Sequence, residues 1–250
     1  MNKNGAQKYL DKIQKMLNWV QENQYEKIIE VSEILTEAII DKKTIWAFGC
    51  SHSSMLTAEI FYRAGGLMVF NGIFPPGLWL KEIPPTKTSK IENLPGYAEI
   101  VFEEHNIDSD DILLIFSTSG RNNVPVEMAL KARENNVKTI AVTSLDYSQN
   151  VASRHKSGKN LYEIADLVLD NGVPKGDATI KFEEMEQKVG PGSTITGAAI
   201  LNAISCQIVE NLLEKGITPP VYKSGNLDGA REFNEKLLKE YEEVIKYMPY

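Results

Sequence analysis

The sequence predicts an α/β protein in which helices cover both faces of a five-stranded parallel sheet. Short apolar runs, which are typical of buried strands, recur at residues 44–49, 67–70, 112–116, 139–142 and 167–169. Stretches with apolar residues at helical spacing lie among them, at residues 55–63, 125–134 and 194–214. Strands that alternate with helices form βαβ units, in which the strands are parallel. The expected architecture is therefore a three-layer αβα sandwich of the flavodoxin-like or Rossmann-like kind.

Further helices are expected at both ends of the chain. Residues 6–23 and 28–39 place apolar side chains at helical spacing, which predicts two helices before the first strand. Residues 228–247 show a charged amphipathic pattern that predicts a C-terminal helix. No shift in composition marks a domain boundary. We therefore expect one domain over residues 1–250, with helical extensions at 1–43 and 218–250 around a core at 44–217.

Two segments interrupt the alternation of strands and helices. Residues 72–96 are rich in proline, and residues 171–193 combine proline with several glycines. Long loops inside compact domains are often lids or interface segments. The first segment is expected to form such a loop beside the second strand.

Composition excludes several classes of function. A net charge of −7 argues against sequence-independent nucleic-acid binding, although a locally positive pocket for a small anion is compatible with it. Cys50 and Cys206 lie far apart in the sequence and are expected to be reduced thiols. The N-terminus lacks the apolar core of a signal peptide, and no apolar run approaches about 18 residues. We expect a cytoplasmic protein that binds neither nucleic acid nor membranes.

Hydroxyl groups are concentrated where the predicted strands end. Residues 49–54 read Gly-Cys-Ser-His-Ser-Ser, residues 117–123 read Ser-Thr-Ser-Gly-Arg-Asn-Asn, and Thr143 and Ser144 follow the next strand. Ligands of open parallel sheets bind at the carboxyl ends of the strands, where such loops present N–H and hydroxyl groups to an anion. The alternative is that these side chains merely cap helices. Neither loop has the Gly-Lys-Ser/Thr ending or the G-x-G-x-x-G spacing of nucleotide sites.

These motifs resemble a known family. Residues 48–53 (Phe-Gly-Cys-Ser-His-Ser), 116–120 (Phe-Ser-Thr-Ser-Gly) and 139–143 (Thr-Ile-Ala-Val-Thr) together resemble the SIS domain of phosphosugar isomerases and phosphosugar-responsive regulators. Residues 58–66, 197–203 and 226–229 resemble a bacterial subfamily of stand-alone SIS proteins labelled phosphoheptose isomerase-like. The resemblance covers nearly the whole chain. It implies a phosphorylated sugar or amino sugar as the ligand.

The resemblance also implies which residues bind this ligand. In the family the Ser-Thr-Ser-Gly loop holds the sugar phosphate, and the first loop contacts the sugar or the phosphate. Ser51 stands where the family usually has a second glycine, and Asn122 stands where it often has threonine. The implied ligand-binding residues are Ser51, His52, Ser53, Ser117, Thr118, Ser119, Asn122, Ser193 and Thr194.

Isomerisation of a sugar phosphate requires groups that carry protons. An aldose and a ketose interconvert through an enediol, so one base moves a carbon-bound proton and another group manages the protons on oxygen. Glu59, within an apolar helical run, is the candidate base; the alternative is an ion pair with Arg63 at i+4. His52, in a strand-end loop, and His155, in a basic turn, are candidates for the second group. Lys159 in the same turn is a candidate anion ligand, although this turn is equally typical of a solvated surface.

The resemblance carries over less well to catalysis. Phosphoheptose isomerases use a histidine and a glutamate one helical turn apart after the first loop, where this chain has Glu59 and Arg63. Their metal site is therefore not expected here, and no cofactor is implied. The leading hypothesis is an aldose–ketose or amino-sugar phosphate isomerase. The alternatives are a non-catalytic phosphosugar sensor that binds a protein partner, and an ether-cleaving lyase of amino-sugar phosphates, which would need a glutamate in place of Arg63.

Apolar faces on the terminal helices and on residues 194–214 exceed what one sandwich can bury. We therefore predict a homodimer with its active site near the subunit interface.

Overall fold

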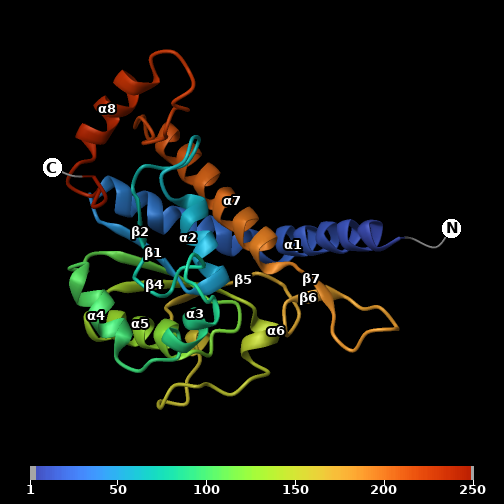
Figure 1. The fold of residues 1–250 in the computed structure, drawn as a ribbon. Helices are drawn as coiled ribbons and strands as arrows, with labels where there is room; N and C mark the ends of the chain where they lie inside the picture. Colours follow the sequence, from blue (N-terminus) through green and yellow to red (C-terminus); the bar gives the residue numbers. More distant parts are fainter. Residues whose placement is uncertain (1–3, 249–250) are drawn as a thin grey trace.

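A five-stranded parallel sheet lies at the centre of the molecule, with helices on both faces (Figure 1). This computed structural model describes residues 4–248. The strands are β1 (Ile45–Gly49), β2 (Phe70–Ile73), β3 (Ile112–Phe116), β4 (Lys138–Thr143) and β5 (Leu167–Asp170). All neighbouring pairs are parallel, in the order β2-β1-β3-β4-β5. The predicted fold class is confirmed, and the strand order reverses between β1 and β3, where sheets of this type bind ligands.

The strands are buried because both faces of the sheet are covered. Every residue of β1 and β3 is buried. Alternate side chains of β3 point to opposite faces, since Leu114 packs with the long helices on one side and Leu113 with α4 and α5 on the other. The continuous apolar runs that predicted the strands are a consequence of this double burial.

Helices form the outer layers. On one face lie α1 (Gly5–Ile40), α2 (Ser54–Ile60) and α7 (Ser193–Glu214), and on the other lie α3 (Thr86–Ile91), α4 (Tyr97–Glu104), α5 (Asn123–Glu134) and α6 (Leu145–Ser148) (Figure 1). Two short 3₁₀ helices, η1 (Ser51–Ser53) and η2 (Leu161–Glu163), follow β1 and α6, and α8 (Ala230–Glu240) lies near the C-terminus. By length and composition α7 could span a membrane, but here it packs along α1 and against α2.

The N-terminal region forms one helix, so the prediction of two helices was wrong. Residues 24–27, which separate the two apolar patterns, contain neither glycine nor proline. The helix continues through Gln24, whose buried side chain accepts the N–H of Asp170 at 2.9 Å. A polar residue on the buried face thus has a specific partner at the edge of the sheet, and the interruption in the apolar pattern is not a helix end.

The predicted strand at 67–70 was displaced from the observed one, because β2 begins only at Phe70. Residues 67–69 are buried in extended contact with the C-terminal part of the chain, where Met68 N donates to Pro220 O at 2.7 Å. The apolar run therefore indicates that the segment is buried. It does not distinguish a strand from a packed loop, since both can be buried. Similarly, α2 ends at Ile60 and does not reach the predicted residue 63.

The C-terminal segment covers the free edge of the sheet. Asn71 in β2 donates through Nδ2 to Val244 O at 2.8 Å and accepts the N–H of Lys246 at 2.7 Å. Tyr247 Oη donates to Met68 O at 2.8 Å. The edge strand therefore has polar partners from residues far along the chain.

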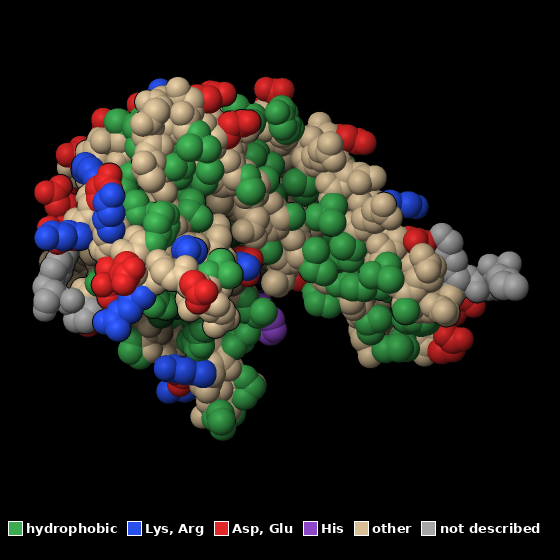
Figure 2. Space-filling view, turned by 90° about the horizontal axis from the view of Figure 1, so that it is seen from above, with side chains coloured by type: hydrophobic (Ala, Val, Ile, Leu, Met, Phe, Trp, Pro, Cys, Tyr) green, Lys and Arg blue, Asp and Glu red, His purple; other side chains and the backbone are tan. Residues whose placement is uncertain are grey.

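Residues 171–193 contain a hairpin that the sequence did not predict. Its strands, β6 (Ala178–Ile180) and β7 (Val189–Pro191), are antiparallel, and it projects from the sandwich beside the beginning of α1 (Figure 1). Tyr9 Oη donates to Pro191 O at 2.7 Å, which ties the hairpin to this helix. Figure 2 shows hydrophobic side chains gathered on this projecting end, with a hollow between it and the rest of the molecule.

Candidate functional site

Two polar loops meet where the strand order reverses. The first, residues 50–54, follows β1, and the second, residues 117–123, follows β3. Gly49 and Phe116, the last residues of these strands, are register partners, so both loops leave the sheet at the same level. The first loop folds back tightly, since a Cβ on Gly49 would lie 2.5 Å from Ser53 O. Both polar loops thus lie next to each other at the carboxyl end of the sheet.

The second loop presents unused N–H groups. Its carbonyls are engaged on the β4 side: Thr118 O accepts from Ser144, and Gly120 O from Leu161, at 3.0 and 2.7 Å. Within residues 4–248, no hydrogen bond uses the backbone N–H groups of residues 119–123, which lead into the N-terminus of α5. Gly120 has φ of 60°, the left-handed conformation that favours glycine. Consecutive free N–H groups at a helix start form a cradle for an anion.

Hydroxyl and amide side chains surround this cradle. Ser117 is buried at the end of β3, while Thr118, Ser119 and Asn122 are half-buried. Asn122 starts α5 without capping it through its side chain. These four residues therefore belong to the same loop as the free N–H groups, and their binding of a sugar phosphate stays a prediction.

The first loop has a different geometry. Ser51 has φ of 51°, and its N–H donates to Leu78 O at 2.8 Å. Its carbonyl accepts the hydroxyl of Ser54 at 2.6 Å. A left-handed conformation costs a non-glycine residue about 1–2 kcal/mol, so the serine that replaces the family's usual glycine retains a glycine-like backbone. The side chain of His52 is exposed, and Ser53 lies half-buried beside it.

Glu92, which the sequence reasoning missed, connects the two loops. Ser51 Oγ donates to Glu92 Oε2 at 3.3 Å, and the side chain of Asn122 lies close enough to lower the pKa of this carboxyl. Burial raises the pKa of Glu92, while the bonds from Asn122 and Ser51 and the charge of Arg154 oppose the rise. Glu92 follows α3 inside the proline-rich segment 72–96, where no periodic signal singled it out.

Two arginines add positive charge beside the second loop. Arg154 Nη1 donates to Asn122 Oδ1 at 2.7 Å, and the N–H of Arg154 donates to Arg121 O at 2.8 Å. Among the described residues, Arg121 Nε is buried without a partner. Arg121 lies inside the loop motif itself, so its position in the sequence was a usable signal. Arg154 belongs to the same basic turn as the predicted site residues His155 and Lys159.

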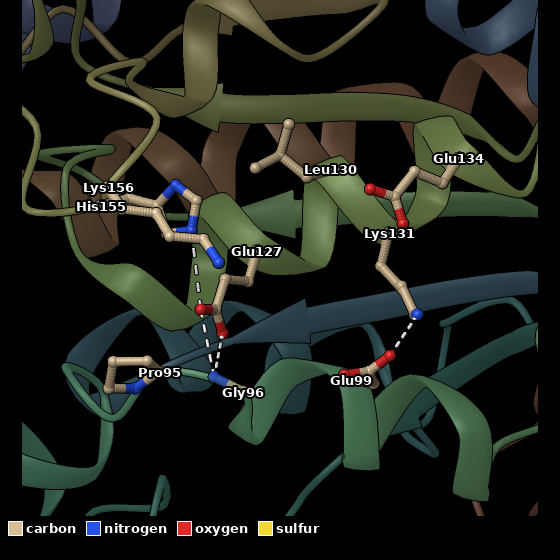
Figure 3. A pocket seen from close by; sticks show the side chains of 9 residues that line it. All are labelled: Pro95, Gly96, Glu99, Glu127, Leu130, Lys131, Glu134, His155 and Lys156. Atoms are coloured by element: carbon tan, nitrogen blue, oxygen red, sulfur yellow. Dashed lines mark hydrogen bonds and ion pairs between the residues drawn. The ribbon is translucent and has the colours of Figure 1, made fainter.

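His155 lies in a groove between α4 and α5, not between the loops (Figure 3). Its Nε2 lies 3.6 Å from Glu127 Oε1, and its Nδ1 lies 2.9 Å from Ser157 Oγ. The two oxygens of Glu127 accept the N–H of Gly96, at 3.1 and 2.9 Å, at the start of α4. His155 therefore supports the contact between α4 and α5. Lys159 is exposed four residues further on.

Glu59 forms the ion pair with Arg63 that was the alternative to a catalytic role. Its Oε1 also accepts the side-chain amide of Asn202 in α7 at 3.0 Å. Among the described residues, no hydrogen bond or ion pair joins Glu59 to either loop. The structure thus places Glu59 between α2 and α7, outside the group formed by Ser51, Glu92 and Asn122.

Ser193 and Thr194 begin α7, and Asp177 occupies this helix start. Asp177 Oδ1 accepts the N–H groups of Gly192 and Ser193 at 2.9 and 2.8 Å, and Oδ2 accepts the hydroxyl of Ser193 at 2.6 Å. The hydroxyl proton of Ser193 is therefore already used within the protein. A carboxylate here also competes with a phosphate for the same N–H groups.

Neither cysteine forms a disulfide, since Cys50 is a buried free thiol and Cys206 an exposed one. Burial, and then the charge of Glu92, raise the pKa of Cys50 well above its ordinary value, so the thiol is neutral beside the site. Among residues 4–248, no three His, Cys, Asp or Glu side chains lie together as metal ligands would.

Comparisons with known proteins agree with this fold. A family model described as SIS domain matches residues 8–144. A UPF0309 protein of Shouchella clausii is 40% identical over 243 residues, which cover 97% of this chain and 99% of the relative. A UPF0309 protein of Oceanobacillus iheyensis is also 40% identical, over 96% of this chain and 98% of the relative.

Solved structures show the same fold at low sequence identity. A phosphoheptose isomerase from Neisseria gonorrhoeae is 17% identical with a TM-score of 0.52, over 80% of this chain and 95% of that protein. A phosphoheptose isomerase from Francisella tularensis is 12% identical with a TM-score of 0.50, over 83% of this chain and 95% of that protein. Their likeness concerns the backbone architecture.

Proposed function

Because the chain belongs to the SIS domain family, we propose that it binds a phosphorylated sugar between residues 50–54 and 117–123 and isomerises it. The observation that carries this proposal is the set of free N–H groups at residues 119–123. A phosphate dianion satisfies several such donors at once, and the start of α5 adds the favourable end of a helix dipole. The hydroxyls of Ser117, Thr118 and Ser119 add further donors.

The sugar would extend from this phosphate towards the first loop. Since β1 and β3 are adjacent, residues 50–54 are the next polar surface along the edge of the sheet. His52 is exposed on this loop and is our candidate for moving protons on the sugar oxygens. Glu59 is a weaker candidate base than it was from sequence, because Arg63 and Asn202 hold it between two helices.

The first test is thermal denaturation with inorganic phosphate and with a panel of hexose and pentose phosphates. A ligand at about 100 times its Kd adds roughly 2.7 kcal/mol to the stability of the folded state. We expect at least one sugar phosphate to raise the melting temperature of the wild type. Ser119→Ala should weaken this effect by about tenfold in Kd, which is the loss of one hydrogen bond to a charged group.

Ser109→Ala is the matched control, because Ser109 lies in the turn before β3. This turn is at the amino end of the strand, whereas the proposed site is at its carboxyl end. The substitution should leave the ligand effect unchanged. If no phosphorylated compound stabilises the wild type, the proposed function is wrong. Stabilisation by a sugar phosphate without any turnover would identify the alternative function, a phosphosugar sensor.

A further inference from the structure

Glu92 lies at the junction of the two loops, and we infer that it is the catalytic base that carries a proton between adjacent carbons of the bound sugar phosphate. This inference rests on the proposed isomerase function and adds the identity of the reacting group. Among the carboxylates of residues 4–248, Glu92 alone interacts with a side chain of each loop: it accepts a hydrogen bond from Ser51 Oγ at 3.3 Å, and the side chain of Asn122 favours its charged form. A sugar bound across the two loops would therefore lie next to this carboxylate.

The backbone of Glu92 is fixed to the same helix that starts at the phosphate cradle. Its carbonyl accepts the N–H of Val124, in the first turn of α5, at 3.0 Å. The next carbonyl, that of Asn93, accepts the side-chain amide of Asn123 at 2.7 Å. The separation between the cradle and the carboxylate is therefore set by one helix turn. Catalysis needs this kind of fixed geometry, since a misplacement of about 1 Å can cost roughly 10²-fold in rate.

The surroundings of the carboxylate suit a base. Burial makes it a stronger base by raising its pKa from the ordinary glutamate value of 4.5, and the polar contacts only partly offset this. The charged or titratable groups that face it are Arg154, which favours the carboxylate, and the neutral thiol of Cys50. Arg154 also donates a hydrogen bond to Asn122, so its positive charge lies beside both the base and the phosphate loop.

The proposed step balances without a further reactant. The carboxylate of Glu92 takes the proton from the carbon next to the carbonyl carbon, and the electrons of that C–H bond form the C=C bond of the enediol. The carbonyl oxygen takes up the hydroxyl proton from the neighbouring carbon. Glu92 then returns its proton to the former carbonyl carbon, and the neighbouring oxygen becomes the new carbonyl.

Other glutamates near the sheet edge are already committed to protein contacts. Glu59 pairs with Arg63, and Glu127 accepts the N–H of Gly96 beside His155. Neither bonds to a side chain of the two loops. This contrast separates Glu92 from the residues that the sequence pattern favoured.

The test is deuterium incorporation from D₂O into the same panel of hexose and pentose phosphates, followed by NMR, with turnover measured in parallel. We expect Glu92→Gln to lower both rates by about 10²- to 10⁴-fold, the usual contribution of a general base. Glu92→Asp should retain part of the rate, with the acid limb of the pH profile displaced. Glu99→Gln, an exposed glutamate on α4 paired with Lys131, is the matched control and should keep the wild-type rates.

Stabilisation by inorganic phosphate separates the possible failures. Glu92→Gln should bind phosphate within about twofold of the wild type, which also shows that the variant is folded. If Glu92→Gln exchanges deuterium within about threefold of the wild type, Glu92 is not the base, although the proposed function stands. If the wild type itself exchanges no deuterium with any sugar phosphate, both the isomerase function and the role of Glu92 are wrong.

Discussion

At the scale of single residues, the site combines positions that the sequence could reveal with positions that it could not. Ser117, Thr118 and Ser119 directly follow a strand, so their place at the edge of the sheet follows from the predicted topology. Glu92 follows a short helix in a proline-rich segment, and its place depends on the contact between its own carbonyl and Val124. Asp177 likewise caps α7 from a position well before the helix begins. Contacts between distant segments leave no periodic pattern in the local sequence, so the positions of Glu92 and Asp177 could not be predicted.

The raised pKa of Glu92 predicts a pH-dependent stability cost. Below the ordinary value of 4.5 the carboxyl is protonated in both folded and unfolded chains, so the fold loses nothing. As the pH rises through the raised folded-state pKa, the unfolded chain is favoured because its carboxylate is solvated. The neutral Glu92→Gln should therefore melt higher relative to the wild type at about pH 8 than at about pH 4.

Calorimetry at both pH values checks this prediction. Glu99→Gln should show the opposite trend, because Lys131 lowers the pKa of Glu99 in the folded state. An equal effect of Glu92→Gln at the two pH values would contradict a buried, proton-retaining carboxyl.

At the scale of elements, the strands and helices of the sandwich were predictable because each buries an apolar face of characteristic period. The exceptions share a physical reason. Residues 67–69 are apolar because they are packed under the C-terminal segment, and Gln24 is polar because it binds the edge of the sheet. The hairpin of β6 and β7 has strands of three residues each, too short for any period to show. The hydrophobic pattern of the sequence therefore mispredicts secondary structure where tertiary contacts determine whether a residue is buried.

The role of Gln24 in holding α1 to the sheet predicts a clear cost of its loss. Gln24→Ala leaves the N–H of Asp170 without its acceptor in a buried setting, which should cost about 1–3 kcal/mol of unfolding free energy. Glu22→Ala, at an exposed position two residues earlier, should change stability by less than about 0.5 kcal/mol. Chemical denaturation of both variants measures the difference, and equal stabilities would show that Gln24 is dispensable.

At the scale of the whole molecule, α7 has more apolar surface than this chain covers. Less than half of its most apolar stretch is buried, although its composition is that of a core helix. A groove of about 550 Å³ runs between α1 and α7, with Val20, Ile28, Ala203 and Cys206 among its lining residues. Exposed apolar faces of this size mark interaction sites. A second copy of the chain offers the same apolar helices in return, so we propose a symmetric dimer through this face.

Sedimentation velocity at micromolar concentration should therefore give twice the chain mass of 28.0 kDa. Ala203→Glu, which places a charge in the groove, should shift the protein to monomer. Ile100→Glu, at an exposed apolar position on α4 on the opposite face, should leave the dimer intact. A monomeric wild type would refute the prediction.

The wrapping of β2 by the C-terminal segment has a consequence for how the chain is made. Asn71 is translated long before its partners Val244 and Lys246, which lie 173 and 175 residues further along the chain. Until then, the outer edge of the sheet lacks its cover while the rest of the sandwich is already complete in sequence. Uncovered strand edges invite pairing with other chains. The newborn protein is therefore most open to aggregation in the interval before residues 244–246 have been made.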